Sequence, residues 1–430
     1  TNWIDKMFKN NAKTQNYTVG INGGTATSSY AVSLGYYSQE GIVGGSSVSN
    51  YERYNVRANM EQKLYGDFLK VGEIISMSYT KNKGIGTGNM YNNKLRGAYS
   101  SSPLQSLYLQ NDGRADLNNG YGYSIASDWY QYDGNPVASL YRGNNINDGQ
   151  NWVANVYAES QPVKNLKIKS QMGYNYSSSS YRSYSPDYVS TTNDMQTSGS
   201  TAYQSMYKGW SLTWTNTATY DWKMGLHAFN AMIGIETERS QGDNMNGTNT
   251  LLSVYDQWST AYLSNEKNTS SGTVYGYPSE DYHRVSYFGR IGWNYNETYM
   301  FNATIRRDGS SRFADGHRYG TFPSVSAGWV ISNEKFMKST ASWLDFLKLR
   351  GSWGQVGNNN IGAYLYAATV SLKGSAYNFG TGKGTTVNSN GAYSNRLGND
   401  ELKWETSEQT DFGFDANFLS SRLGFNFDWY

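Results

Sequence analysis

The residue types that commonly catalyse reactions or hold metals occur in this sequence, but their spacing does not assemble a site. The three histidines, His227, His283 and His317, are scattered, and none lies in the H-E-x-x-H or Glu-x-x-His pattern of a zinc site. No G-x-S-x-G nucleophile elbow occurs. The glycine-rich run at 380–385 misses the phosphate-loop spacing, because its lysine is followed by Gly384. The sequence therefore predicts no catalytic residue, no metal site and no cofactor.

Binding is the chemistry that the residues favour, because aromatic rings recur beside amides and carboxylates in the longer polar segments. Flat apolar rings next to hydrogen-bonding groups suit the recognition of sugars or peptides. The candidate binding residues are Trp129, Tyr130, Tyr132 and Tyr141, and a second cluster of Tyr255, Trp258, Tyr275 and Tyr277. The same rings could instead pack long loops together or contact a partner protein. Asp112 with Asp116, or Asp243, offers oxygen ligands for calcium, but neither matches a complete calcium loop.

Composition limits the class of protein that positions these residues. Aromatic residues make up 16% of the chain and charged residues also 16%, well below the roughly 25% charge of soluble domains. The net charge of +2 comes with no basic stripe for nucleic acid, and the lack of cysteine excludes disulfides and thiolate metal sites. No apolar run is long enough for a transmembrane helix. Aromatic girdles around a membrane β-barrel would use the surplus of rings.

Period-two alternation recurs in segments of roughly ten residues separated by turn residues, a pattern typical of membrane β-strands. In residues 210–220, Trp214 belongs to an apolar face, while the opposite face carries only serine and threonine. About fourteen such strands are expected. The alternation predicts that Arg284, Arg290 and Arg306 face the lumen of a barrel, and that Trp214, Ile291 and Ile305 face lipid.

Connection lengths favour a barrel over a soluble sandwich or propeller, because short and long links alternate along the chain. Short links are expected at 23–28, 63–66, 161–165, 221–225, 294–298 and 419–422, with a longer helical link at 332–345. Long links are expected at 39–50, 81–150, 177–209, 239–283, 308–321 and 356–403. The predicted fold is therefore an all-β, antiparallel outer-membrane barrel with long extracellular loops and short periplasmic turns.

Several strings follow one another in order along nearly the whole chain. They are TNWID at 1–5, LGY at 34–36, QEG at 39–41, RDGSSRF at 307–313, RYG at 318–320, FPSVSAGW at 322–329, LKLRGSWGQ at 347–355 and LKWE at 402–405. These strings resemble the barrel of SusC/RagA-like TonB-dependent transporters of Bacteroidota. The resemblance implies energy-dependent uptake of oligosaccharides or peptides through the outer membrane of a Gram-negative bacterium. It also implies a SusD-like surface lipoprotein as lid and TonB as the energy donor.

A transporter barrel of this type needs about 22 strands, so residues 1–430 are predicted to form part of a barrel domain. The amino-terminal plug, the TonB box and the closing strands are expected to lie outside this chain. The alternative function is that of a non-transporting adhesin or a passive channel, and an outer-membrane hydrolase is a weaker alternative. The motif at 308–313 is interpreted as a loop brace, because Asp308-Gly309 is a favourable tight-turn dipeptide.

Overall fold

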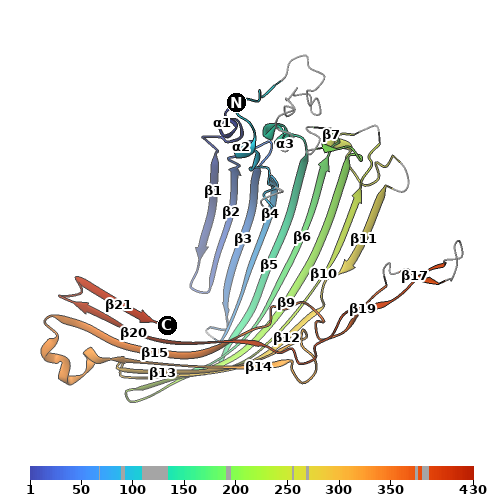
Figure 1. The fold of residues 1–430 in the computed structure, drawn as a ribbon. Helices are drawn as coiled ribbons and strands as arrows, with labels where there is room; N and C mark the ends of the chain where they lie inside the picture. Colours follow the sequence, from blue (N-terminus) through green and yellow to red (C-terminus); the bar gives the residue numbers. More distant parts are fainter. Residues whose placement is uncertain are drawn as a thin grey trace.

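The chain folds as one long, curved sheet in which successive strands lie side by side (Figure 1). A computed structural model describes residues 1–66, 68–88, 93–108, 134–189, 195–253, 256–267, 271–372, 376–379 and 387–430, with only the backbone given for 376–379 and 387–390. The path of paired strands runs from β1 at one edge to β21 at the other. Neighbouring strands are antiparallel throughout.

The path contains fourteen strands, which confirms the expected number. A fifteenth, β11, pairs with the end of β10 beyond β12, so β11 and β12 together act as one interrupted strand. The strands of the sheet are β1 (Thr14–Gly24), β2 (Ser28–Glu40), β3 (Asn50–Leu64), β4 (Leu69–Lys83), β5 (Asn144–Val163), β6 (Leu166–Ser185), β9 (Thr201–Met224), β10 (His227–Asn249), β11 (Gly272–Pro278), β12 (Tyr282–Tyr295), β13 (Tyr299–Ser310), β14 (Tyr319–Val330), β15 (Leu344–Asn358), β20 (Glu405–Phe418) and β21 (Leu423–Trp429).

Short helices and hairpins lie in the links between the strands of the sheet. They are α1 (Trp3–Met7), α2 (Gly97–Ser100), α3 (Pro136–Tyr141), η1 (Trp258–Thr260), η2 (Ile331–Asn333), η3 (Lys335–Thr340), β7 (Tyr188–Val189), β8 (Met195–Gln196), β16 (Thr369–Ser371), β17 (Ala376–Phe379), β18 (Val387–Asn390) and β19 (Tyr393–Arg396). None of the helices in the described ranges is long and apolar enough to cross a membrane. Helices α1, α2 and α3 share a small core in which Trp3 and Met7 are buried.

Because consecutive strands are antiparallel, alternate links lie at opposite ends of the sheet. The links at one end are residues 25–27, 65–68, 164–165, 225–226, 296–298, 331–343 and 419–422. All of these are short except 331–343, which holds η2 and η3 and matches the expected helical link. The longer links all lie at the opposite end. In outer-membrane barrels the short turns face the periplasm and the long loops face outside.

Two segments expected to be long loops, 177–209 and 239–283, contain long strand extensions. Strand β6 continues to Ser185 and β9 begins at Thr201, while β10 continues to Asn249. The long links were predicted at the right places, but their bounds were too wide, because outward positions beyond the lipid layer do not need apolar side chains. The apolar alternation therefore stops while the hydrogen-bonded ladder continues.

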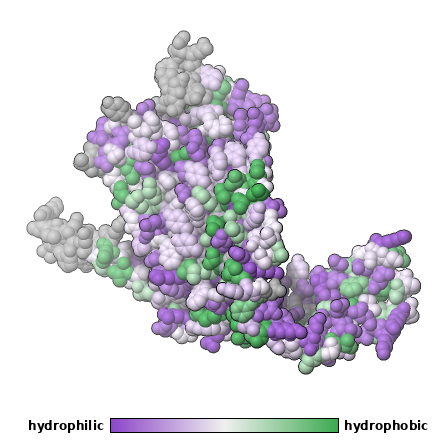
Figure 2. Space-filling model, turned by 180° about the vertical axis from the view of Figure 1, so that it is seen from behind, coloured by the Kyte–Doolittle hydropathy of each residue, from purple (hydrophilic) through white to green (hydrophobic). Residues whose placement is uncertain are grey.

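The two faces of the sheet differ in chemistry. We call the face that carries Trp214 and Ile235 the outer face, and the face that carries Thr215 and Glu236 the inner face. Apolar side chains on the outer face are open, with Trp214 exposed by 48% and Ile233 by 70%. On the face seen in Figure 2, apolar side chains gather over the middle of the strands. Such a surface suits contact with lipid rather than water.

Aromatic rows bound this apolar band. Near the short-turn end, eight rings form a continuous row with centroids 4.7 to 6.5 Å apart: Tyr220, Trp222, Phe229, His227, Trp293, Tyr295, Tyr299 and Trp329. A second row toward the loop ends of β1 to β4 consists of Tyr17, Tyr36, Tyr54 and Tyr79. Rings of this kind anchor a barrel at the two membrane interfaces.

Candidate ligand-binding site

Charged residues on the inner face of β10, β12 and β13 neutralise one another. The Arg284 guanidinium donates to Glu236 at 3.1 Å and to Glu238 at 2.7 Å. Arg306 also donates to Glu236, at 3.1 Å, and to Asp308 at 2.8 Å. The groups are largely buried, with side-chain exposures between 9% and 33%. The network therefore stiffens the wall, because each partner satisfies charges that burial would otherwise penalise.

Arg290 lies on the same face, nearer the short turns. Its guanidinium donates to the Asn230 side chain at 3.1 Å. The structure thus places Arg284, Arg290 and Arg306 opposite the outer-face residues Ile291 and Ile305. That the three arginines face the lumen of a closed barrel stays a prediction.

Five tyrosines lie on the inner face toward the loop end, and we call this group the tyrosine wall: Tyr181, Tyr203, Tyr207, Tyr275 and Tyr277. The rings of Tyr181 and Tyr203 lie 5.9 Å apart at 57°. The Tyr203 hydroxyl donates to Asn246 at 2.9 Å, and the Asn244 amide donates to Ser279 at 3.0 Å. Tyr275 and Tyr277 are 57% and 53% exposed, so their rings are open to a ligand.

The sequence analysis found only two members of this wall, Tyr275 and Tyr277. It missed Tyr181, Tyr203 and Tyr207 because it assigned residues 177–209 to a loop. One available indication was that all three tyrosines have odd numbers, like the serine and threonine face of residues 210–220. A strand continued through that segment would have placed them on the polar face.

Trp258 lies on the opposite side of the sheet from Tyr275 and Tyr277. Residues 256–267 fold over the outer face of β6 and β9, where the backbone amide of Leu263 donates to the Gln204 side chain at 3.2 Å. The Arg182 guanidinium stacks on the Trp258 ring at 3.8 Å. This tryptophan therefore packs a loop onto the strands, and the structure does not bring it together with the tyrosine wall.

Tyr141 and Trp258 both line a pocket of about 760 Å³ at the loop end of the sheet. Within it, the Tyr184 hydroxyl donates to Asp256 at 2.9 Å and the Arg142 guanidinium lies 3.7 Å from the Tyr188 ring. These contacts hold the loop in place and leave a polar hollow beside it. The remaining predicted binding residues, Trp129, Tyr130, Tyr132 and Tyr255, lie outside the described residues.

The motif at 308–313 braces the base of the loop formed by residues 359–404. Phe313 is fully buried against Phe322 and Trp404. The Arg312 guanidinium forms an ion pair with Glu280 at 2.9 Å, and the hydrogen bonds that it donates to the Glu280 carboxylate raise the pKa of Arg312. These contacts agree with the interpretation of the motif as a structural element. The predicted tight turn at Asp308-Gly309 was wrong, because both residues lie in β13 and pair with β14.

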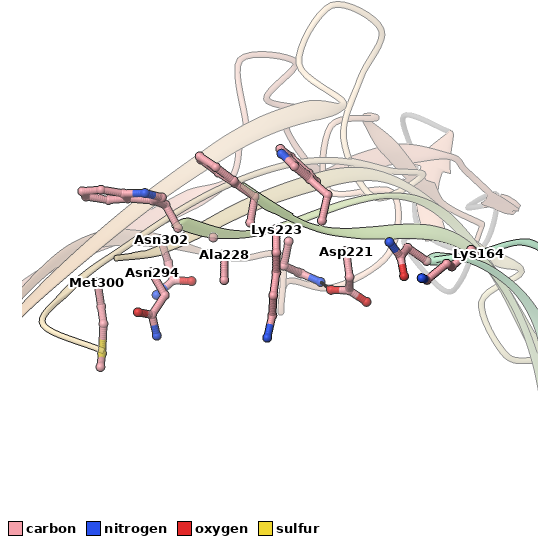
Figure 3. Close-up of a pocket in the computed structure, with 13 residues that line it drawn as sticks. Lys164, Asp221, Lys223, Ala228, Asn294, Met300 and Asn302 are labelled. Carbon is pink, nitrogen blue, oxygen red and sulfur yellow. Dashed lines mark hydrogen bonds between the residues drawn. The ribbon is translucent and has the colours of Figure 1, made fainter. Parts of the chain in front are cut away.

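A shallow groove of about 790 Å³ lies at the short-turn end (Figure 3). Lys164, Asp221 and Lys223 line it together with Asn294 and Asn302. Figure 3 shows Asp221, Lys223 and Asn294 extending from the same side of the sheet. In the part of the chain that the structure describes, no cluster of three or more histidine or acidic residues could hold a metal.

Comparison with protein families identifies this architecture. The family of TonB dependent receptor-like β-barrels matches residues 104–430. The chain belongs to the TonB-dependent receptor β-barrel family. Members of the family are receptors of the Gram-negative outer membrane rather than enzymes, so the predictions of location and of a non-enzymatic role are confirmed.

Individual relatives agree with the SusC-like resemblance. The chain is 29% identical to TonB-dependent receptor SusC of Bacteroides thetaiotaomicron over its full length, and 28% identical to TonB-dependent receptor P26 of Formosa agariphila. It spans 42% of the first relative and 40% of the second. The structure of the RagAB peptide transporter superposes with a TM-score of 0.77 at 22% identity, covering 99% of this chain and 45% of that one. That similarity confirms the barrel fold.

Proposed function

We propose that the full protein imports a bulky nutrient, either an oligosaccharide or a peptide, across the outer membrane with energy supplied through TonB. The observation that carries this proposal is the family match over residues 104–430, together with an uninterrupted antiparallel sheet. A sheet bounded by two aromatic rows suits the membrane, and its polar inner face suits a water-filled passage.

The proposal includes segments beyond residues 1–430. Because the chain spans less than half of its relatives, a plug, a TonB box and closing strands are expected elsewhere in the full protein. TonB would act through that missing region. The open edges of β1 and β21 would then pair with the closing strands, which would satisfy their exposed backbone groups.

A SusD-like lipoprotein is the proposed partner at the loop end. The small core formed by α1, α2 and α3 presents large apolar side chains to solvent there, including Ile42, which is 59% exposed, Tyr99, 77%, and Leu104, 88%. Exposed apolar groups around a packed base suit a protein contact. Substitution of Tyr99 and Leu104 by serine should weaken co-purification of the lipoprotein while leaving barrel assembly intact.

The test of transport uses the full gene in its own host. Deletion should abolish uptake of the nutrient, and re-expression of a variant that lacks the TonB box should not restore it. Uptake that persists without the TonB box would show a passive channel. Normal uptake in the deletion strain, combined with loss of surface attachment, would show an adhesin.

A further inference from the structure

The inner face around the tyrosine wall carries no charge. At the loop end, its positions are the odd-numbered residues of 145–153 in β5, 175–185 in β6, 201–211 in β9 and 273–277 in β11, and the even-numbered residues of 240–248 in β10. All of them are described, and they hold only asparagine, serine, threonine, tyrosine, glycine and one valine. Below them, the charges of Glu236 and Glu238 are paired with Arg284.

The same strand segments do contain charged residues, but these all lie on the outer face. They are Asp148, Arg182, Lys208 and Asp243. Lys208 and Asp243 pair with each other there at 3.3 Å. The uncharged inner wall therefore reflects a difference between the two faces, and a general lack of charge in these strands does not explain it.

The wall is also left open by the loop next to it. Residues 256–267 contact the outer-face residues Tyr184, Ala202 and Gln204, so this loop covers the outer face. Tyr275 and Tyr277 keep more than half of their surface exposed. Rings, amides and hydroxyls are thus presented together along one accessible surface.

These groups match the chemistry of a neutral sugar. Sugar hydroxyls both donate and accept hydrogen bonds, as do the asparagine, serine and threonine side chains of the wall, and the flat sugar faces stack on aromatic rings. A peptide with charged ends, or a uronic acid polymer, would lose hydration on this surface without gaining an ion pair. We infer that the tyrosine wall binds neutral oligosaccharides in preference to peptides or acidic glycans. This inference rests on the proposed transport function and names its substrate class.

The experiment uses the full-length protein, purified with any bound lipoprotein. Affinity is measured by calorimetry for three probes of matched length: neutral hexose oligosaccharides, oligogalacturonides and a mixture of zwitterionic peptides. The Tyr275→Ala/Tyr277→Ala variant should weaken binding of a neutral oligosaccharide by about tenfold, because both stacking surfaces are lost. Tyr275→Phe/Tyr277→Phe keeps both rings and should retain most of the affinity.

Tyr287→Ala is the matched control, because Tyr287 lies on the outer face with a similar exposure of 49%. It should leave affinity unchanged. Binding of peptides or oligogalacturonides without neutral oligosaccharides would overturn the inference, as would full affinity in the double alanine variant. Uptake assays separate the two proposals. TonB-dependent uptake of peptides alone would support the proposed transport function and contradict the inference that the substrate is a neutral oligosaccharide. Uptake that never requires TonB would contradict the proposed transport function itself.

Discussion

Trp258 and Tyr277 belong to one aromatic cluster in the sequence, yet they lie on opposite faces of the sheet. Trp258 stacks on Arg182 beneath a loop on the outer face. Tyr277 stands on the inner face with 53% of its surface exposed. The ring types are similar, so ring chemistry alone does not decide the role. The face of the strand does, because one face is covered by a loop and the other is open.

A similar contrast holds along the membrane band. Outer-face rings such as Trp214 lie on the surface of the protein, where lipid would surround them in the membrane. The rings around Phe313 are instead buried by neighbouring loops. An exposed aromatic residue on the sheet of this chain therefore has one of two environments. It meets lipid when it belongs to the outer band, and it is available to a ligand when it lies on the inner wall.

The largest loss of stability is expected from substitution of Phe313, the buried ring in this comparison. Phe313→Ala should cost about 3 to 5 kcal/mol of local stability, because a fully buried ring leaves a cavity. Hydrogen exchange and limited proteolysis should then increase in residues 359–404. Leu397→Ala in the same loop is the control, since that side chain is 87% exposed. Equal protection of the loop in both variants would contradict the brace.

The next effect tests the two faces directly. Trp214→Arg should place a charge in lipid at a cost of about 2 to 4 kcal/mol and reduce barrel assembly. Thr213→Arg is the matched change, because Thr213 lies on the inner face opposite Glu238, which can pair with the new charge. Heat-modifiable migration of the full-length protein in gels measures folded barrel. Similar yields of the two variants would argue against this assignment of the faces.

A smaller effect should follow from Trp258→Ala. Loss of the stacking on Arg182 should cost about 0.5 to 2 kcal/mol and loosen residues 256–267, as seen by hydrogen exchange. Ligand affinity should stay unchanged, in contrast to the loss expected from the tyrosine wall. A clear drop in ligand affinity without loosening of the loop would show that Trp258 contacts the ligand and does not serve mainly to pack the loop.

The smallest structural effect comes from single cysteines that report topology. Ser46→Cys at the loop end should react with an impermeant thiol reagent on intact cells, because Ser46 is exposed in a link expected outside. Lys164→Cys in a short turn should not react. Lys164 is preferable to Asn165, whose φ of 73° suits asparagine better than cysteine. Labelling at residue 164 without labelling at residue 46 would show that the short turns, and not the long links, face the outside of the cell.

Much of the fold follows from local patterns. Within the lipid band the period-two alternation was strong enough to predict about fourteen strands, because most outward positions are apolar there. The links at 164–165 and 225–226 fell where turn residues predicted them. The extensions of β6, β9 and β10 were missed, since above the band both faces can be polar and the alternation fades.

The sequence by itself determined the membrane strands, their order and the polar side of each, because lipid favours apolar side chains at outward positions and requires backbone groups to be paired within the sheet. It also contained the family strings that predict a SusC-like barrel. Only the tertiary structure decided which aromatic residues stand together. Tyr181, Tyr203 and Tyr277 come from three strands, and strand pairing places them on one wall. Trp258 was separated from them because its loop folds over the outer face, and that choice depends on contacts between segments distant in sequence.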